Sequence, residues 1–323
     1  MRDQYNRNIE YLRISVTDRC NLRCRYCMPE DGVKWMPHDS ILSFEETLRL
    51  IRISTELGFR RFRITGGEPL VRKGILGFLR ESANTPGVED LMITTNGILL
   101  PQMAEDLKAA GVQRVNISLD TMNSDRFRHI TRGGDVSAVK EGVFRSLDVG
   151  LDPVKINVVV VRGVNTDELA DFAGLARDYP LHIRFIELMP IGVSSGKRKD
   201  FFSIMEMKEA LGLREDMPAP DVLGFGPAEY VRPEGFQGSL GFISALSRHF
   251  CDTCNRVRLT ADGKLRTCLH NKKEADLRAA VRDGSSDEEI KDQMTRAIRQ
   301  KPAGHSMNSE ALQGLRIMSQ IGG

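Results

Sequence analysis

The sequence predicts an α/β fold, an incomplete (β/α)6 TIM-like barrel of parallel strands followed by a C-terminal extension. Short apolar segments of strand length alternate with amphipathic segments of helix length from residue 11 to about residue 190, as in parallel α/β proteins. Six strand–helix units can be recognised, whereas a closed barrel of this class needs eight. The alternation stops after Pro190, so we expect residues 1–190 to form the barrel core and residues 191–323 the extension. A doubly wound sheet is the less favoured alternative.

The expected elements follow one another in a regular order. The predicted strands cover residues 11–16, 61–65, 90–95, 114–119, 154–161 and 181–188. The predicted helices cover residues 44–57, 99–110, 137–149 and 166–176, with a further one near 287–300. The first helix follows Ser43, whose side chain is a suitable N-cap. In the extension, residues 217–241 are rich in glycine and proline and show no clear periodicity.

The predicted strands carry one polar and one apolar face, because side chains alternate along a strand. The polar faces comprise Arg13, Ser15 and Thr17; Arg61, Arg63 and Thr65; Asn116, Ser118 and Asp120; and Lys155 and Asn157. If helices cover the apolar faces, these polar faces line the barrel interior, where cations are costly without water or an anionic ligand. An antiparallel sheet with one solvated face would alternate equally well, but the intervening helices favour the barrel. The pattern therefore predicts an interior that binds an anion.

The bulk composition excludes several classes of function. The net charge of +2 is too small to indicate a nucleic-acid or membrane partner. The first ten residues lack the apolar segment of a signal peptide, and no later apolar run is long enough to span a bilayer. We therefore expect a cytoplasmic protein, in which cysteines are more often metal ligands or catalytic groups than disulfides.

The first group of cysteines lies just after the first predicted strand, where barrel enzymes place their chemistry. Cys20, Cys24 and Cys27 follow a CxxxCxxC spacing, and three thiolates on one short loop suit zinc or an iron–sulfur cluster. A structural zinc site normally has a fourth ligand, yet the nearest histidine in sequence is His38. Three ligands on a 4Fe–4S cluster would leave one iron open, so we favour the cluster. The tight spacing argues against coincidental buried thiols.

The second group comprises Cys251, Cys254 and Cys268. From this segment alone two alternatives stay open. A zinc ribbon could be completed by His249 or His270, or the three thiolates could hold a second cluster.

Two longer patterns carry a resemblance to known proteins. The cysteine loop with Tyr26 before its last cysteine, together with Thr65-Gly66-Gly67-Glu68-Pro69, resembles the radical S-adenosylmethionine superfamily. The segments YLRISVTDRCNLRCRYCMPE, RITGGEPLVRK and FISALSRHFCDTCNRVRLTADGKLRTCL, and the final Gly-Gly, resemble the GTP 3′,8-cyclase family of molybdenum cofactor biosynthesis. The resemblance extends over nearly the whole chain.

The resemblance implies a radical enzyme, a lyase, with two 4Fe–4S clusters and S-adenosylmethionine as co-substrate. In that family a 5′-deoxyadenosyl radical removes the 3′ hydrogen of GTP, and the carbon radical attacks C8 of guanine. The product is a 3′,8-cyclo nucleotide, the first intermediate of molybdopterin synthesis. The second cluster would bind the guanine base.

The resemblance also implies roles for individual residues. Contacts to S-adenosylmethionine are expected from Tyr26, Gly67, Ser118 and Met189; contacts to GTP from Arg13, Arg63, Thr95, Lys155, Arg256, Val257 and Arg258. Arg61 and Arg184 are further candidates, with solvated surface charge as the alternative for both. The tail Gly322-Gly323 is expected to enter the active site, because glycine permits close backbone approach.

The expected partners are GTP, a low-potential electron donor of flavodoxin or ferredoxin type, and, by product transfer, a cyclic pyranopterin monophosphate synthase. A homodimer is also expected. The sequence departs from the family pattern at Ile130–Gly134, which lacks a second arginine, and at His270, where an aromatic residue is common. Two other functions compete: a radical peptide maturase with an auxiliary cluster, and a non-enzymatic zinc-binding module. The maturase would leave the interior cations without a triphosphate, and the zinc module would leave CxxxCxxC and GGEP unexplained.

Overall fold

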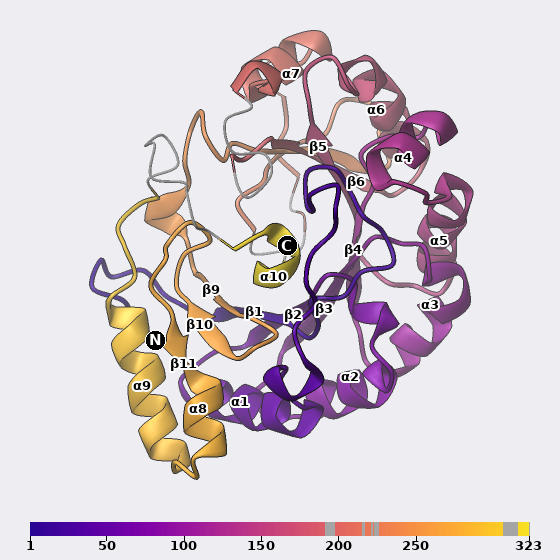
Figure 1. Cartoon of the computed structure of the whole chain (residues 1–323). Helices are drawn as coiled ribbons and strands as arrows, with labels where there is room; N and C mark the ends of the chain where they lie inside the picture. The colour runs from indigo at the N-terminus through magenta and orange to yellow at the C-terminus, as the bar shows by residue number, and fades with distance from the viewer. Residues whose placement is uncertain (191–197, 215–216, 221, 223–225, 306–315, 323) are drawn as a thin grey trace.

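The computed structural model describes residues 1–190, 198–214, 217–220, 222, 226–305 and 316–322. Within this part of the chain one 11-stranded sheet curves around a central space, in the order β11-β10-β9-β1-β2-β3-β4-β5-β6-β8-β7 (Figure 1). Its strands are β1 (Tyr11–Ser15), β2 (Arg61–Thr65), β3 (Asp90–Thr95), β4 (Arg114–Ser118), β5 (Val154–Val160), β6 (His182–Glu187), β7 (Glu229–Val231), β8 (Ser239–Ile243), β9 (Arg256–Leu259), β10 (Lys264–Arg266) and β11 (Ala275–Asp276).

The six predicted strands are confirmed as β1 to β6, and they pair in parallel in chain order. The parallel pairing rules out the antiparallel alternative, and the incomplete barrel is confirmed. The extension does more than pack against this barrel, because β9 adds in parallel to β1 and β8 adds in parallel to β6. The sequence analysis does not predict β8, because this strand is only five residues long and begins at the end of a segment rich in glycine and proline.

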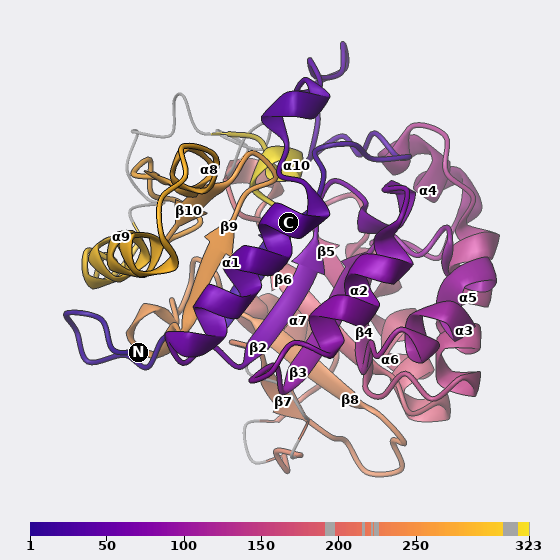
Figure 2. The ribbon, with the colours of Figure 1, turned by 90° about the horizontal axis from the view of Figure 1, so that it is seen from below.

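Helices cover the outer face of the sheet, as Figure 2 shows for α1 and α2. They are α1 (Phe44–Glu56), α2 (Ile75–Ala83), α3 (Leu100–Ala109), α4 (Ser124–Thr131), α5 (Val136–Asp148), α6 (Leu169–Asp178), α7 (Ile204–Ala210), α8 (Leu277–Arg282) and α9 (Asp287–Arg299). The short helix α10 (Met318–Ile321) lies inside the barrel instead. The N-cap of α1 is confirmed: Ser43 forms a capping box with Glu46. The short helices α2, α4, α7, α8 and α10 were not predicted.

The hydrophobic core lies between the sheet and the helices. Leu12 and Ile14 of β1 and Phe62 and Ile64 of β2 are fully buried in it. The polar face of the same strands is thereby turned toward the barrel interior, as the alternation predicted. No helix among the described residues is both long and apolar enough to cross a membrane.

Candidate active site

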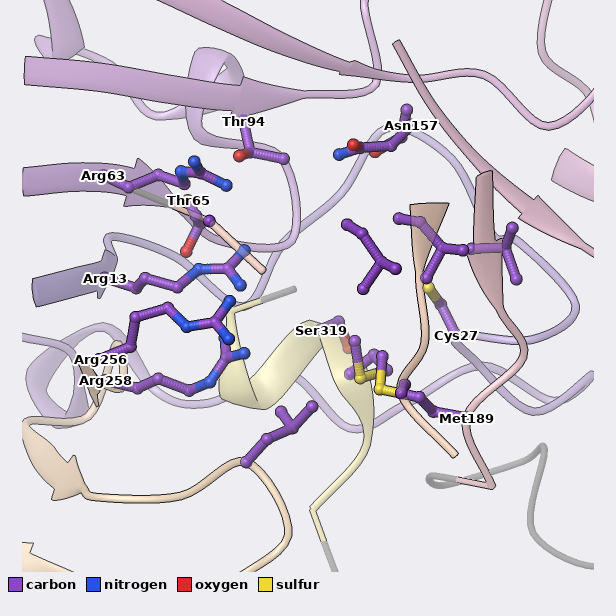
Figure 3. A pocket seen from close by; sticks show the side chains of 18 of the residues that line it. Arg13, Cys27, Arg63, Thr65, Thr94, Asn157, Met189, Arg256, Arg258 and Ser319 are labelled. Carbon is purple, nitrogen blue, oxygen red and sulfur yellow. The ribbon is translucent and has the colours of Figure 1, made fainter. Parts of the chain in front are cut away.

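The barrel interior contains one large cavity of about 320 Å³ that both cysteine triplets line. Cys20, Cys24 and Cys27 reach it from the loop after β1, and Cys251, Cys254 and Cys268 reach it from the segments around β9 and β10. Figure 3 shows Arg13, Arg63, Arg256 and Arg258 gathered on one side, with Cys27 and Met189 on the other. Two candidate metal centres and a group of cations therefore share one cavity.

The loop of the first triplet is fixed by the glycines after β2. The backbone N–H of Gly67 donates to the carbonyl of Thr17 at 2.7 Å, and that of Glu68 donates to the carbonyl of Arg19 at 2.8 Å. A Cβ atom at Gly67 would lie 2.3 Å from the Arg19 carbonyl oxygen. The second glycine of the motif is therefore required because two backbones meet there.

Arg132 holds the other side of the same loop. Its Nη1 atom donates to the carbonyls of Arg23 and Met28, each at 3.1 Å, and of Pro29 at 3.2 Å. Arg132 has a φ of 56° at the C-cap of α4, a left-handed conformation that is uncommon for a non-glycine residue. The ITRGG segment, which departs from the family pattern, thus positions the first triplet.

The first triplet lies beside carboxyl groups. Burial raises the pKa of Cys20 to about 11 and that of Cys24 to about 12, with Glu68 and Asp120 respectively adding to the effect. The Tyr26 hydroxyl donates to Asp120 Oδ2 at 2.5 Å. Thiolates at this position therefore require a metal centre to compensate their charge.

The second triplet has the opposite surroundings. Burial alone would raise the pKa of Cys254, but the positive charges of Arg256 and Lys301 outweigh it and lower the pKa to about 7. Arg256 also lies over the ring of Phe250, 4.9 Å from its centroid. The proposed zinc ligands His249 and His270 do not line the cavity. Among the described residues, no three Cys, His, Asp or Glu side chains are gathered as ligands of one metal ion.

Three arginines form one row across neighbouring strands. Arg13 of β1 is in register with Arg258 of β9 on one side and with Arg63 of β2 on the other. Like charges in such positions repel one another, and burial together with Arg258 and Arg63 lowers the pKa of Arg13 well below its ordinary value. A multiply charged anion would relieve this cost.

A second, smaller cavity of about 10 Å³ continues from this row. It is lined by Arg63, Arg114, Asn116, Lys155, Arg184, Gly226 and Tyr230. Burial and the neighbouring arginines lower the pKa of Lys155 to about 6. The predicted cation Lys155 and the further candidate Arg184 thus lie together beside the main cavity, whereas Arg61 is paired with Glu10 and lines neither cavity.

Several buried polar atoms facing the cavities have no hydrogen-bond partner among the described residues. They are Arg63 Nε, Thr94 Oγ1, Asn157 Oδ1, Arg184 Nε and Ser319 Oγ. Buried polar atoms are rarely left in this state. The residues present therefore fit a polar, anionic ligand, and the two sets of three thiols fit iron–sulfur clusters in their donor chemistry.

The C-terminal tail enters the barrel, where α10 is seen at the centre of the sheet (Figure 1). Met318 and Ser319 line the main cavity. Gly322 has a φ of +80°, and a Cβ atom there would lie 2.7 Å from both Ser15 Cβ and Thr65 Oγ1. Gly323 lies outside the described residues.

Most of the predicted site residues line the main cavity: Arg13, Tyr26, Arg63, Gly67, Thr95, Ser118, Met189, Arg256 and Arg258, with all six cysteines. The Val257 side chain is instead buried in the hydrophobic core, so only its backbone is available to a ligand. The Thr95 hydroxyl donates to Glu68 Oε1 at 2.8 Å, whereas the Thr94 hydroxyl faces the cavity.

Sequence reasoning missed Thr94, Lys301, His305 and Ser319, which also line the cavity. Thr94 lies on the same side of β3 as Met92, so counting alternate residues along that strand would have found it. The other three lie in the extension, where no periodic pattern was available.

Two families match adjoining parts of the chain. Residues 14–176 match the Radical SAM superfamily, and residues 181–307 match Molybdenum Cofactor Synthesis C. GTP 3′,8-cyclases of Syntrophomonas wolfei subsp. wolfei and Heliobacterium modesticaldum are each 52% identical to this chain over 328 aligned residues, covering 100% of both sequences. A GTP 3′,8-cyclase of Moorella thermoacetica is 50% identical over 324 residues, again at 100% coverage of both.

Solved structures of other proteins share the fold of this chain. Streptococcus suis SuiB bound to S-adenosylmethionine has a TM-score of 0.61 at 15% identity, covering 91% of this chain and 68% of SuiB. SuiB bound to its precursor peptide SuiA has a TM-score of 0.62 at 14% identity, covering 97% and 76%. The full-length sequence relatives show which family within the superfamily this chain belongs to. They confirm the resemblance to the GTP 3′,8-cyclase family that the motifs indicated. The chain belongs to the GTP 3′,8-cyclase family of the radical S-adenosylmethionine superfamily.

Proposed function

We propose that this protein converts GTP into (8S)-3′,8-cyclo-7,8-dihydroguanosine 5′-triphosphate, the first step of molybdopterin biosynthesis. The observation that carries the proposal is the single cavity that both cysteine triplets and the arginine row line. Two relatives that are 52% identical to this chain over its full length are GTP 3′,8-cyclases. A peptide maturase would have no use for the arginine row.

The chemistry that a bound 4Fe–4S cluster supplies is the one-electron cleavage of S-adenosylmethionine to a 5′-deoxyadenosyl radical. That radical would take the 3′ hydrogen of the GTP ribose to give 5′-deoxyadenosine, and the resulting carbon radical would bond to C8 of guanine. The base radical formed in this way would take up one further electron, from the electron donor, and one proton to give the 7,8-dihydro product. Cys20, Cys24 and Cys27 would hold the first cluster, and Cys251, Cys254 and Cys268 the second, beside which the guanine would bind. One cavity between the two triplets places the reacting groups close together.

We assign residues to S-adenosylmethionine or to GTP according to where their side chains lie in the cavity. Tyr26, Gly67, Ser118 and Met189 would contact S-adenosylmethionine beside the first triplet. Arginine and lysine are suited to the phosphates of GTP, so we assign these to Arg13, Arg63, Arg256, Arg258 and Lys155, with Arg184 beside them. Thr95 stays a predicted contact. Thr94 is an additional one, because its hydroxyl has no hydrogen-bond partner in the described part of the chain.

The C-terminal tail is assigned a role in closing the site. Met318, Ser319 and Gly322 occupy the interior of the barrel next to the cations. A closed, water-poor cavity protects radical intermediates from side reactions. Gly323 is included in this proposal as the end of the same tail.

The reaction needs an electron donor, which we propose to be a flavodoxin or ferredoxin. We also propose product transfer to a cyclic pyranopterin monophosphate synthase, and a homodimeric state that light scattering would test. Six free cysteines committed to two metal centres favour a reducing compartment such as the cytoplasm.

The decisive experiment is anaerobic turnover after cluster reconstitution. We expect about eight iron and eight sulfide per chain, and GTP-dependent formation of 5′-deoxyadenosine with dithionite and S-adenosylmethionine. ATP in place of GTP is the matched control. A preparation with one cluster's worth of iron and stoichiometric zinc, or with no GTP-dependent 5′-deoxyadenosine, would overturn the proposal.

A further inference from the structure

A short segment after α9 contacts the second triplet through a buried lysine. Lys301 is 2% exposed and lines the main cavity. Its Nζ atom donates to the carbonyl of Arg256 at 2.9 Å and to the carbonyl of Thr267. These two residues lie two positions after Cys254 and directly before Cys268. One ammonium group therefore links the two chain segments that carry these cysteines.

The same ammonium group has a third N–H donor beyond the two carbonyls. Cys254 and Cys268 both interact electrostatically with Lys301. The lysine is thus a buried cation beside Cys254 and Cys268, rather than a surface cation.

Arg7 fixes the remaining cysteine to the same segment. Its guanidinium donates to the carbonyl of Cys251 at 2.8 Å, and to those of Pro302 at 2.6 Å and Ala303 at 2.9 Å. Asp3, whose side chain is fully buried, pairs with Arg7 and neutralises it. Arg7 therefore contributes geometry, while Lys301 contributes both geometry and a positive charge that is paired with no carboxylate among the described residues.

The charge around a cluster and the hydrogen bonds to its sulfurs set its reduction potential, because reduction adds a negative charge. The first triplet faces Glu68 and Asp120, and Lys301 lies at the second triplet alone. A substitution of Lys301 should therefore change the reduction potential of the second cluster and leave that of the first cluster unchanged.

We propose that Lys301 is a positioning residue for the second cluster, which holds the Cys254 and Cys268 segments together and raises the reduction potential of that cluster. The inference rests on the proposed function, since it requires a cluster at the second triplet. It concerns a residue that lies beside the second triplet, not at the first.

The test uses full-length, reconstituted protein and redox titration followed by electron paramagnetic resonance. Signals are assigned to each cluster with variants in which one triplet is changed to alanine. In Lys301→Met, which keeps the length of the side chain, we expect the reduction equilibrium constant of the second cluster to fall about tenfold, which is about 59 mV for a one-electron couple. The first cluster should keep its potential. Lys140→Met, which removes an exposed lysine of α5, is the matched control.

Lys301→Arg keeps the positive charge but changes the shape of the side chain. We expect this variant to retain the second cluster at its original reduction potential. If Lys301→Met retains less than full iron, Lys301→Arg with full iron supports the proposal. Loss of iron in both variants, an unchanged second potential in a fully loaded Lys301→Met, or an equal shift of both clusters would overturn it. Turnover and iron content of the unaltered protein are measured first, so that a failure of the proposed function is recognised separately.

Discussion

Arg258 donates a hydrogen bond from Nη1 to the carbonyl oxygen of Gly322 at 2.9 Å. An arginine of the cavity row thereby holds the C-terminal tail inside the barrel. Arg258 is also one of the arginines that we propose bind the triphosphate, and in that case the position of the tail would be coupled to the position of the triphosphate.

Replacing Gly322 by alanine should displace the tail from the barrel. The new Cβ atom would lie 2.7 Å from Ser15 and Thr65, in a backbone conformation of φ +80° that disfavours alanine. We expect kcat to fall on the order of 10²-fold with little change in the thermal unfolding temperature. Limited proteolysis of the C-terminus should become faster.

Gly212→Ala is the control for this variant, because Gly212 has a φ of +62° but open space around its Cβ position. It carries the same kind of backbone strain without the close contacts. Equal losses of activity in the two variants would count against a role for tail placement.

Arg132→Gly should loosen the first cysteine loop. Glycine tolerates the backbone φ of 56° but removes the hydrogen bonds to the carbonyls of Arg23, Met28 and Pro29. We expect chelator-promoted iron loss from the first cluster to accelerate roughly tenfold, corresponding to about 1.4 kcal/mol. Arg128→Ala, which changes an exposed arginine on the same helix, should have the unaltered rate.

Arg13→Met should weaken GTP binding without lowering the stability of the ligand-free protein. Removing one charge from the row relieves repulsion with Arg63 and Arg258, so the ligand-free variant should unfold at a temperature no lower than the unaltered protein. Its affinity for GTP should fall about 10- to 100-fold, as for one lost charged hydrogen bond, and GTP should raise its unfolding temperature less.

Arg61→Met is the matched control, since Arg61 is the neighbouring arginine of β2 but is paired with Glu10 outside the cavity. It should keep the full stabilisation by GTP. If Arg61→Met loses that stabilisation while Arg13→Met keeps it, the assignment of the phosphate site is wrong.

Lys155 should make GTP binding depend on pH. Burial and the nearby arginines lower the pKa of Lys155 to about 6 in the ligand-free protein, and bound phosphates would favour its charged form. Binding should therefore take up a proton above pH 6, and affinity should weaken as pH rises from about 7.5 to 9. Calorimetry in buffers of different ionisation enthalpy measures the uptake, which Lys155→Met should abolish and Lys140→Met should not.

The lowered pKa of Lys155 also makes the stability of the ligand-free protein depend on pH. Because the unfolded chain binds this proton more tightly than the folded chain, the contribution of Lys155 to stability rises with pH between about 6 and the ordinary lysine pKa of about 10.4. The contribution is lost as pH falls through this window. Comparing denaturant unfolding of the unaltered protein and Lys155→Met at two pH values checks the sign.

The sequence carried enough information for the β1–β6 barrel because the alternation of Arg13 with Leu12 and Ile14, and of Arg63 with Phe62 and Ile64, marks both faces of these strands. The cysteine spacings predicted both metal centres. Thr94 and Thr95 of β3 both line the cavity, but only the structure shows that the Thr95 hydroxyl donates to Glu68, whereas the Thr94 hydroxyl has no hydrogen-bond partner among the described residues. Lys301 could not be found, because its role depends on a contact with segments distant in sequence.

The pairing of β9 with β1 sets an order of events in biosynthesis. Residues 11–15 are made first and residues 256–259 late, yet these strands are neighbours in the finished sheet. Until residues 239–243 and 256–259 have been made, β6 and β1 respectively are open edges that invite pairing with other chains. The second triplet meets the first only when this long-range contact has closed, which is intrinsically slow. The two triplets can therefore face one another only after residues 251–268 have been made and β9 has paired with β1. A product truncated before β9 would leave the β1 edge open beside the first triplet.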